Sequence, residues 1–313
     1  MVSQVSFRPL RQIASYVSIA WGFVESDMFT FAIPNTAFGV FGAFASLLLV
    51  DNQTPSLAPS VAAILSRLPY VLAFNIGNLL IFDLANQRGP KSIAEDRINK
   101  PWRPIPQGKI TADQTRRFML ATIPTVLALN YAVGAWQQGV LILVLSWMYN
   151  DLGGGDEALL REVIIAIAYG LFNSGSLLVA VGPGCSLNAL GVGWTSIVSG
   201  IILTTMQVQD LKDQAGDKLR RRKTIVLFFG ERFSRTSIAF FVCFWSCVCG
   251  AFWSVGPVVF FLNVATALFI ALRVLLLCSP KADARTWRIW CFWHASLYTL
   301  PVVVMGTSRL GLQ

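Results

Sequence analysis

Charged residues, histidine and cysteine are all scarce in this 313-residue chain. Only 13% of the residues are charged, roughly half the ~25% of an ordinary soluble chain, while 55% are hydrophobic and the mean hydropathy is +0.60. This balance argues against a soluble enzyme, and the 22 Phe and 10 Trp argue against a disordered chain. A single histidine, His294, excludes a His-rich zinc or iron site, and six dispersed cysteines exclude a disulfide scaffold.

Long apolar runs dominate what is present, and each run is a candidate membrane helix. A helix needs roughly 20 apolar residues to cross ~30 Å of hydrocarbon. Hydropathy separates nine runs, of which 136–150 is short enough to leave eight as the alternative count. The sequence therefore predicts an all-α integral membrane protein, with one transmembrane domain over residues 1–313 and about nine helices bundled around a central cavity. The predicted spans are 29–50, 60–85, 114–134, 136–150, 162–182, 189–209, 236–254, 257–278 and 287–306.

A short segment precedes the first predicted span. Residues 1–21 contain Arg8 and Arg11 but no acidic residue, and no small-x-small cleavage site follows a compact apolar core. We therefore expect residues 1–25 to form an amphipathic helix at the membrane interface, with an organellar presequence as the alternative.

The basic residues gather on one side of the predicted membrane. Segments 86–117 and 210–235 each hold eight Lys or Arg. With nine spans, 23 of the 25 basic residues fall on the same side, and only Arg67 and Arg309 do not. This matches the positive-inside rule, so topology accounts for the net charge of +9 and nucleic-acid binding is not expected.

Carboxylates and amides recur at helical spacing where each of the two most basic segments begins. Counted from the first residue of each set, the others follow at offsets of three and four in the first set and of three and seven in the second. On a helix each set would share one face. Such oxygen-rich faces beside Lys and Arg suit Mg²⁺, which prefers few carboxylates, retained waters and phosphate oxygens. The alternative is that the acids only balance neighbouring basic residues. The sets are Asp83, Asn86 and Gln87, and Asp210, Asp213 and Asp217.

Four amide side chains lie inside apolar runs, where a polar group is costly and faces another helix or a cavity. Each alone is compatible with an interhelical hydrogen bond, but together they predict a cavity with a polar mouth. These residues are Asn75, Asn78, Asn130 and Asn173.

The polar segments resemble the two aspartate motifs of the UbiA superfamily, which contains intramembrane prenyltransferases and related terpene cyclases. The run Asn99-Lys100-Pro101-Trp102-Arg103-Pro104 is similar to the tail of the first motif, and Asp210-x-x-Asp213-x-x-x-Asp217 is similar to the second. The resemblance covers nearly the whole chain in architecture.

The first motif departs from the usual pattern of that family. Its aspartates are usually four residues apart, whereas Asp83 and Asp96 are separated by 13 (96 − 83). Either Asp96 fills the second position after an insertion, or Gln87 is a neutral substitute. We favour Asp96 because it precedes Asn99 by three residues. The divergent pattern most resembles the fungal membrane-bound terpene cyclases.

The resemblance implies Mg²⁺-dependent ionisation of a prenyl diphosphate. Breaking the allylic C–O bond leaves a diphosphate with about three negative charges, which Mg²⁺, Lys and Arg stabilise electrostatically. The predicted catalytic residues are Asp83, Asp96, Asp213 and Asp217, and the predicted metal ligands are these four and Asp210. The predicted substrate-binding residues are Asn78, Asn86, Gln87, Lys100, Arg103, Lys212 and Arg97, with Lys223 as a further candidate.

Aromatic faces would stabilise the resulting carbocation by ~0.5–2 kcal/mol each. The candidates are Trp147, Tyr149, Phe172 and Trp194, each with core packing or interfacial anchoring as the alternative. The run 220–223 is interpreted as attracting anionic lipid headgroups.

Three functions compete. If the cation is quenched intramolecularly, the protein is a terpene cyclase of secondary metabolism acting on a C15 or C20 prenyl diphosphate, which we favour. If it alkylates an aromatic or quinone-precursor ring, the protein is a prenyltransferase. A transporter of a phosphorylated solute would need a clear internal repeat, and the ends of spans two and six supply a weak one. His294 lies away from the aspartates, so no general base for a phenol is visible.

The expected surroundings follow from this function. The expected partners are a prenyl diphosphate substrate and membrane lipid. The expected location is the endoplasmic reticulum membrane, with the active site facing the cytosol. The sequence does not indicate an oligomeric state.

Overall fold

Helices make up almost all of the computed structural model, which describes residues 8–52 and 59–309. The elements of the first half are α1 (Arg8–Asp27), the short π-helix η1 (Met28–Ala32), α2 (Ile33–Phe44), α3 (Ser46–Leu49), β1 (Val50–Asn52), α4 (Val61–Gln87), α5 (Pro90–Asn99), α6 (Ala112–Ala132) and α7 (Trp136–Asn150). The second half contains the 3₁₀ turn η2 (Gly154–Asp156), α8 (Ala158–Val181), β2 (Cys185–Leu187), α9 (Ala189–Thr205), the 3₁₀ turn η3 (Met206–Val208), α10 (Asp210–Arg220), α11 (Ile225–Phe228), α12 (Glu231–Phe252), α13 (Pro257–Leu276), α14 (Pro280–Leu297) and α15 (Leu300–Arg309).

Several helices begin at a side chain that caps them. Ser60 before α4 and Ser279 before α14 each accept a hydrogen bond from the backbone N–H three residues on. Thr111 and Gln114 form a reciprocal capping box at the start of α6. These contacts satisfy N–H groups that have no partner within a helix. The local sequence therefore sets where these helices start.

Six of the nine predicted spans coincide with described helices that are long and apolar enough to cross a membrane. They are α4, α8, α9 with η3, α12, α13, and α14 continued by α15. The all-α membrane class is therefore confirmed, but the count of nine is not. The predicted span 29–50 is divided among η1, α2, α3 and β1. The span 114–134 matches α6, which carries three charges in its first two turns, and 136–150 matches α7, only 15 residues long.

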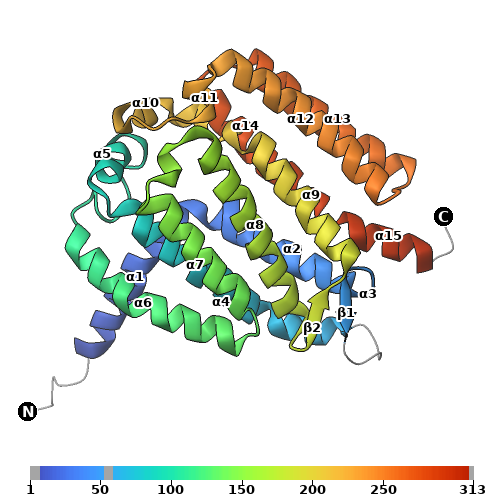
Figure 1. Ribbon diagram of the computed structural model, residues 1–313, viewed down its shortest axis with the longest axis horizontal. Coiled ribbons are helices and arrows are strands. Elements are labelled where there is room, and N and C mark those ends of the chain that lie inside the picture. The colour runs from blue at the N-terminus through green and yellow to red at the C-terminus, as the bar shows by residue number, and fades with distance from the viewer. Residues whose placement is uncertain (1–7, 53–58, 310–313) are drawn as a thin grey trace, which may run out of the picture.

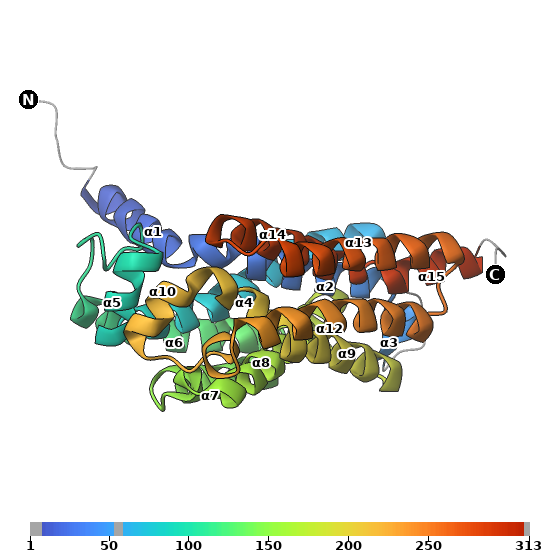
Figure 2. The same cartoon turned by 90° about the horizontal axis from the view of Figure 1, so that it is seen from above.

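A two-stranded sheet that the hydropathy pattern does not predict lies at one end of the bundle (Figure 1). Strands β1 and β2 are antiparallel, and Val50 pairs with Leu187. Both views place α5 and α10 at the opposite end (Figures 1 and 2). The two most basic loops therefore meet at one end of the molecule, as the charge pattern predicts.

The N-terminal segment predicted to lie at the membrane interface is only partly described. Helix α1 begins at Arg8, and residues 1–7 lie outside the described residues. In the described side chains of α1, Tyr16 and Trp21 are exposed whereas Phe23 is fully buried. This division is typical of an amphipathic helix, and its place at the interface stays a prediction.

Three of the four predicted intramembrane amides, Asn75, Asn78 and Asn130, bridge helices. Asn78 of α4 and Asn130 of α6 exchange two hydrogen bonds of 3.0 Å, and a Cβ atom on Gly139 of α7 would lie 2.0 Å from the Asn130 amide nitrogen. Asn75 donates to Thr36 of α2 and to Ser176 of α8. These amides therefore pack the helices together.

Candidate active site

One cavity opens at the end of the bundle where α5 and α10 lie. It is lined by residues of α1, η1, α4, α5, α7, α8, η3 and α10, and of the segments that follow α5, η3 and α10. Its polar part, here called the acid end, consists of Asp27, Asp83, Glu95, Asp96, Asp210, Asp213 and Asp217. Four basic side chains lie among these acids, namely Lys100, Arg103, Arg161 and Arg222. The other wall is apolar, so the cavity joins a charged mouth to a hydrophobic interior.

Asp83 comes from the last turn of α4 and is almost fully buried. Gln87, one turn later, donates to Asp83 Oδ1 at 3.4 Å and to the backbone oxygen of Phe23 at 2.9 Å. Asp83 Oδ2 has no hydrogen-bond partner among the described residues. Asn86 lines the cavity and donates to Asn150 of α7 at 2.9 Å. Gln87 therefore holds Asp83 and α1 in place from outside the cavity.

Asp96 lies on α5, and the turn that follows α5 carries its partner. Arg103 Nη1 donates to both oxygens of Asp96, at 2.9 and 3.1 Å, and its Nη2 lies 3.5 Å from Asp27. Asn99 Nδ2 donates to the backbone oxygen of Asp213 at 3.3 Å. Gly216 permits this contact, because a Cβ atom there would lie 2.2 Å from the Asn99 amide nitrogen. The two polar segments are therefore packed directly against each other.

The second motif lies on α10, which is a separate helix. The 3₁₀ turn η3 separates α10 from α9, so the three aspartates share a helix of their own and not a continuation of the membrane helix. Asp210, Asp213 and Asp217 nevertheless all line the cavity. Asp217 Oδ2 has no hydrogen-bond partner in the described part of the chain.

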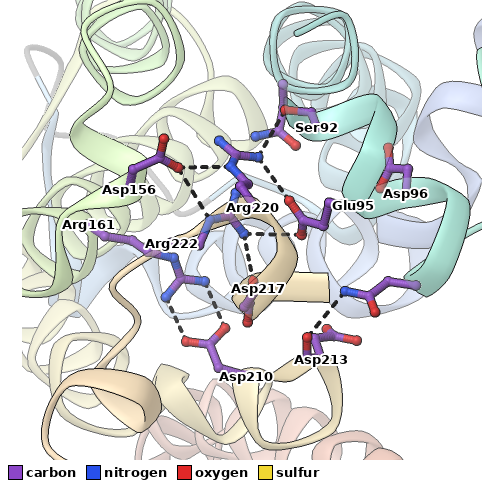
Figure 3. A network of polar contacts seen from close by, with 12 residues as sticks. Ser92, Glu95, Asp96, Asp156, Arg161, Asp210, Asp213, Asp217, Arg220 and Arg222 are labelled. Atoms are coloured by element: carbon purple, nitrogen blue, oxygen red, sulfur yellow. Dashed lines mark hydrogen bonds and ion pairs between the residues drawn. The ribbon is translucent and has the colours of Figure 1, made fainter. Parts of the chain in front are cut away.

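Two arginines at the C-terminal end of α10 join the polar network of the site (Figure 3): Arg220 is the last residue of the helix, and Arg222 lies just beyond it. Arg222 contacts Asp217 at 3.3 Å and Glu95 at 3.4 Å, and Arg220 contacts Glu95 at 3.0 Å and Asp156 at 2.8 Å. Both side chains are buried. The interpretation of this run as a headgroup-binding segment is therefore wrong for Arg220 and Arg222.

Arg161 is a site residue that the sequence argument missed. It lies in the first turn of α8, and it pairs with Asp210 through two hydrogen bonds of 2.9 Å each (Figure 3). The signal was present, because a basic residue at the start of an apolar run is costly unless it is paired.

The remaining predicted substrate-binding residues lie elsewhere. Asn78 and Gln87 are outside the lining of the cavity, as described above, and Arg97 is exposed on α5. Lys212 pairs with Asp213 and lines a neighbouring pocket. That pocket shares Lys100 with the main cavity. Of the seven predicted substrate-binding residues, the structure brings Asn86, Lys100 and Arg103 into the cavity.

The hydrophobic interior contains an aromatic wall, defined as Phe31, Tyr149, Tyr169 and Phe172. The ring of Phe31 meets the rings of Tyr169 and Phe172 edge to face, each with centroids 4.7 Å apart. Two of the four predicted aromatic residues, Tyr149 and Phe172, therefore lie where the hypothesis needs them.

The two tryptophan candidates do not line this cavity. Trp147 is 53% exposed on α7. Trp194 is buried, but its ring packs against Phe252, the last residue of α12, and against Trp253, which follows it. The ring centroids lie 6.1 Å and 5.5 Å away, respectively. Both assignments are wrong, because spacing along the chain does not show which side of a helix faces the cavity.

Burial changes the protonation of the acid end outside the membrane helices. It raises the pKa of Asp217 to about 7, with help from the neighbouring charge of Asp210. Burial also raises the pKa of Asp96, although Arg103 opposes this effect. Burial and the charge of Arg103 lower the pKa of Lys100. The site therefore holds acids that a cation would help to ionise.

Fold and site together define an intramembrane protein with an acid-mouthed cavity that continues into an apolar interior. The chain belongs to the UbiA prenyltransferase family, whose model matches residues 39–297. The resemblance inferred from the two aspartate motifs is therefore confirmed.

Individual relatives sharpen this assignment. The chain is 28% identical over 311 residues to the somaliensene A/B synthase of Streptomyces somaliensis, covering 93% of this chain and 95% of that protein. It is also 28% identical over 314 residues to the diterpene cyclase eriG of Hericium erinaceus, covering 96% and 92%. Among solved structures, a UbiA homolog from Archaeoglobus fulgidus bound to GPP and Mg²⁺ has the same fold, with a TM-score of 0.61, 13% identity, and coverage of 92% of this chain and 99% of that one.

Proposed function

We propose that this protein is a membrane-bound terpene cyclase that ionises a C15 or C20 prenyl diphosphate and cyclises the resulting cation. The observation that carries the proposal is the single cavity in which seven acids and four basic residues adjoin an aromatic wall. A diphosphate fits the charged end, and an isoprenoid chain fits the apolar interior. The two relatives named above as a synthase and a cyclase support the same chemistry.

The acid end suits a divalent cation that arrives with phosphate oxygens. Asp83 and Asp217 line the cavity, and each has a buried carboxylate oxygen with no partner among the described residues. In residues 8–52 and 59–309, no group of three His, Cys, Asp or Glu side chains could hold a metal ion alone. Mg²⁺ typically completes its coordination with waters and substrate phosphates. Once a substrate phosphate and waters supply the remaining ligands, Asp83, Asp213 and Asp217 would hold Mg²⁺, and it would supply charge stabilisation to the departing diphosphate.

The protein's own residues carry the rest of the reaction. Lys100, Arg103 and Arg222 place positive charge where the diphosphate develops negative charge. The aromatic wall faces the carbocation and stabilises it by ~0.5–2 kcal/mol per ring. The apolar lining keeps water from the cation, so it survives long enough to close a ring.

A prenyltransferase is the second candidate, because a neighbouring pocket adjoins the acid end. This pocket shares Asp27, Asn99 and Lys100 with the main cavity and carries Trp21 and Trp287 on its walls. It offers space beside the diphosphate site where a flat acceptor could stack on indole rings.

The proposed surroundings are those the charge pattern predicts. The protein is an integral membrane protein. We propose the endoplasmic reticulum as its membrane, and we orient the acid end toward the cytosol because the basic loops lie at that end.

Product analysis separates the two candidates. Purified protein in lipid nanodiscs is incubated with Mg²⁺ and a C15 or C20 prenyl diphosphate, without an acceptor. A cyclase yields a cyclic hydrocarbon, detected by gas chromatography and mass spectrometry, and Asp83→Asn protein serves as the inactive control. If only linear alcohol forms, and an added aromatic acid or phenol becomes prenylated, the protein is a transferase.

A further inference from the structure

Arg161 carries a buried charge that the proposed reaction has not yet used. It extends from the first turn of α8, and 5% of its side chain is exposed. Its Nη1 and Nη2 donate to the two oxygens of Asp210 at 2.9 Å each, and Nη1 also contacts Glu162. A buried charge in a membrane helix is costly, so its presence points to a function.

A second arginine pair in the same bundle shows the pattern of a structural contact. Arg235 of α12 makes the same two-pronged contact with Asp283 of α14, at 2.9 and 2.8 Å, and is equally buried. Its Nε donates to Glu231 and its Nη1 also donates to the backbone oxygen of Val274. Each of the three nitrogens therefore has a protein partner, and the side chain is outside the cavity lining.

Arg161 differs from Arg235 in both respects. Its Nε is buried and has no hydrogen-bond partner in the described ranges of the chain. Its side chain lines the cavity at the acid end, where Figure 3 places it beside Arg222 and above Asp210. A guanidinium that lines the cavity and has a donor without a protein partner is suited to a phosphate oxygen.

We propose that Arg161 binds the diphosphate of the substrate, and that Asp210 is a positioning residue for Arg161 rather than a metal ligand. The identity of the anion rests on the proposed function. Both oxygens of Asp210 are engaged by Arg161, whereas Asp83 and Asp217 each keep an oxygen without a partner among the described residues. The acid end is thus divided between carboxylates that hold an arginine and carboxylates that are open to a cation.

Calorimetric titration with inorganic pyrophosphate in metal-free buffer tests the role of Arg161. We expect Arg161→Gln to weaken pyrophosphate binding at least ~10-fold. The matched control Arg235→Gln should lower the unfolding temperature and leave the pyrophosphate affinity within about twofold of wild type. Wild-type affinity in Arg161→Gln would overturn the proposal.

A double variant guards against misfolding. Arg161→Gln leaves Asp210 buried without its partner, which can unfold the protein. Replacing both residues, as Arg161→Gln with Asp210→Asn, removes the unpaired charge and should preserve the fold. The folded double variant should show the same loss of pyrophosphate affinity, and retained affinity would contradict the assignment.

Repeating the titration with Mg²⁺ tests the role of Asp210. Asp210→Asn should keep, within about twofold, the gain in pyrophosphate affinity that Mg²⁺ produces in the wild-type protein, whereas Asp217→Asn should lose that gain. Loss of the gain in Asp210→Asn would make Asp210 a metal ligand and overturn its positioning role. If Mg²⁺ produces no gain in wild type, the proposed metal site fails while the result for Arg161 stands.

Discussion

The acid end and the aromatic wall of the cavity are neighbours on the same helices, yet they are held together differently. Helix α8 supplies Arg161, which lies among the acids, and also Tyr169 and Phe172 of the aromatic wall. The acid end depends on ion pairs between segments far apart in sequence, such as Arg222 with Glu95. The aromatic wall depends on edge-to-face ring contacts. Damage to the acid end should therefore change the rate of ionisation, whereas damage to the wall should change the product.

Metal removal should produce the largest effect, because it removes charge stabilisation from the acid end altogether. We expect EDTA to abolish product formation and added Mg²⁺ or Mn²⁺ to restore it. The measurement is the rate of product formation by gas chromatography, with the unfolding temperature recorded to show that the chelated protein stays folded. Full turnover in chelator would remove the metal from the mechanism.

The next largest effect should come from replacing a carboxylate that has one oxygen without a hydrogen-bond partner. Asp83→Asn and Asp217→Asn should each lower kcat at least ~100-fold, on the order of 3 kcal/mol of transition-state stabilisation. Asp113→Asn is the matched control, since Asp113 is an exposed acid at the start of α6 that pairs only with neighbouring arginines among the described residues. A loss below about threefold at Asp83 or Asp217 would mean that its open oxygen has no catalytic part.

Asp96 and Gln87 are the two candidates for the second position of the first motif. Replacing either one should lower kcat by a smaller factor than replacing Asp83 or Asp217. Asp96→Ala should lower kcat at least ~10-fold, because Arg103 loses its principal partner and no longer points at the diphosphate. Gln87→Ala should cost less, since Gln87 acts from outside the cavity. Steady-state kinetics of both variants decide the question, and a dead Gln87→Ala beside an active Asp96→Ala would reverse our choice.

Variants of the aromatic wall should have the smallest effect on rate and a visible effect on product. Tyr169→Leu should shift the mixture towards linear or early-quenched terpenes several-fold, because the cation loses a face that contributes ~0.5–2 kcal/mol. Trp194→Leu is the matched control. It should lower the unfolding temperature through lost packing and leave the product ratio unchanged, since Trp194 packs against α12. An equal product shift in both variants would contradict the wall as defined here.

Motifs close together in sequence were the most predictable part of the site. The aspartates of α10, and Asp96 with Arg103, are near one another along the chain, and all of them line the cavity. Residues that depend on long-range packing were missed. Arg161 meets Asp210 across 49 positions, and Arg220 meets Glu95 across 125. Hydropathy and spacing describe one segment at a time, so they carry no information about such partners.

The sequence by itself determined the membrane class, six spans, the basic end of the bundle and the family, because each depends on composition or on short-range periodicity. Only the tertiary structure decided that Asn78 joins Asn130 instead of lining the cavity, and that Tyr169 rather than Trp194 faces it. Every side of a membrane helix is apolar enough to face lipid, protein or substrate. The side that faces the cavity is therefore set by how the helices pack, and not by their residues alone.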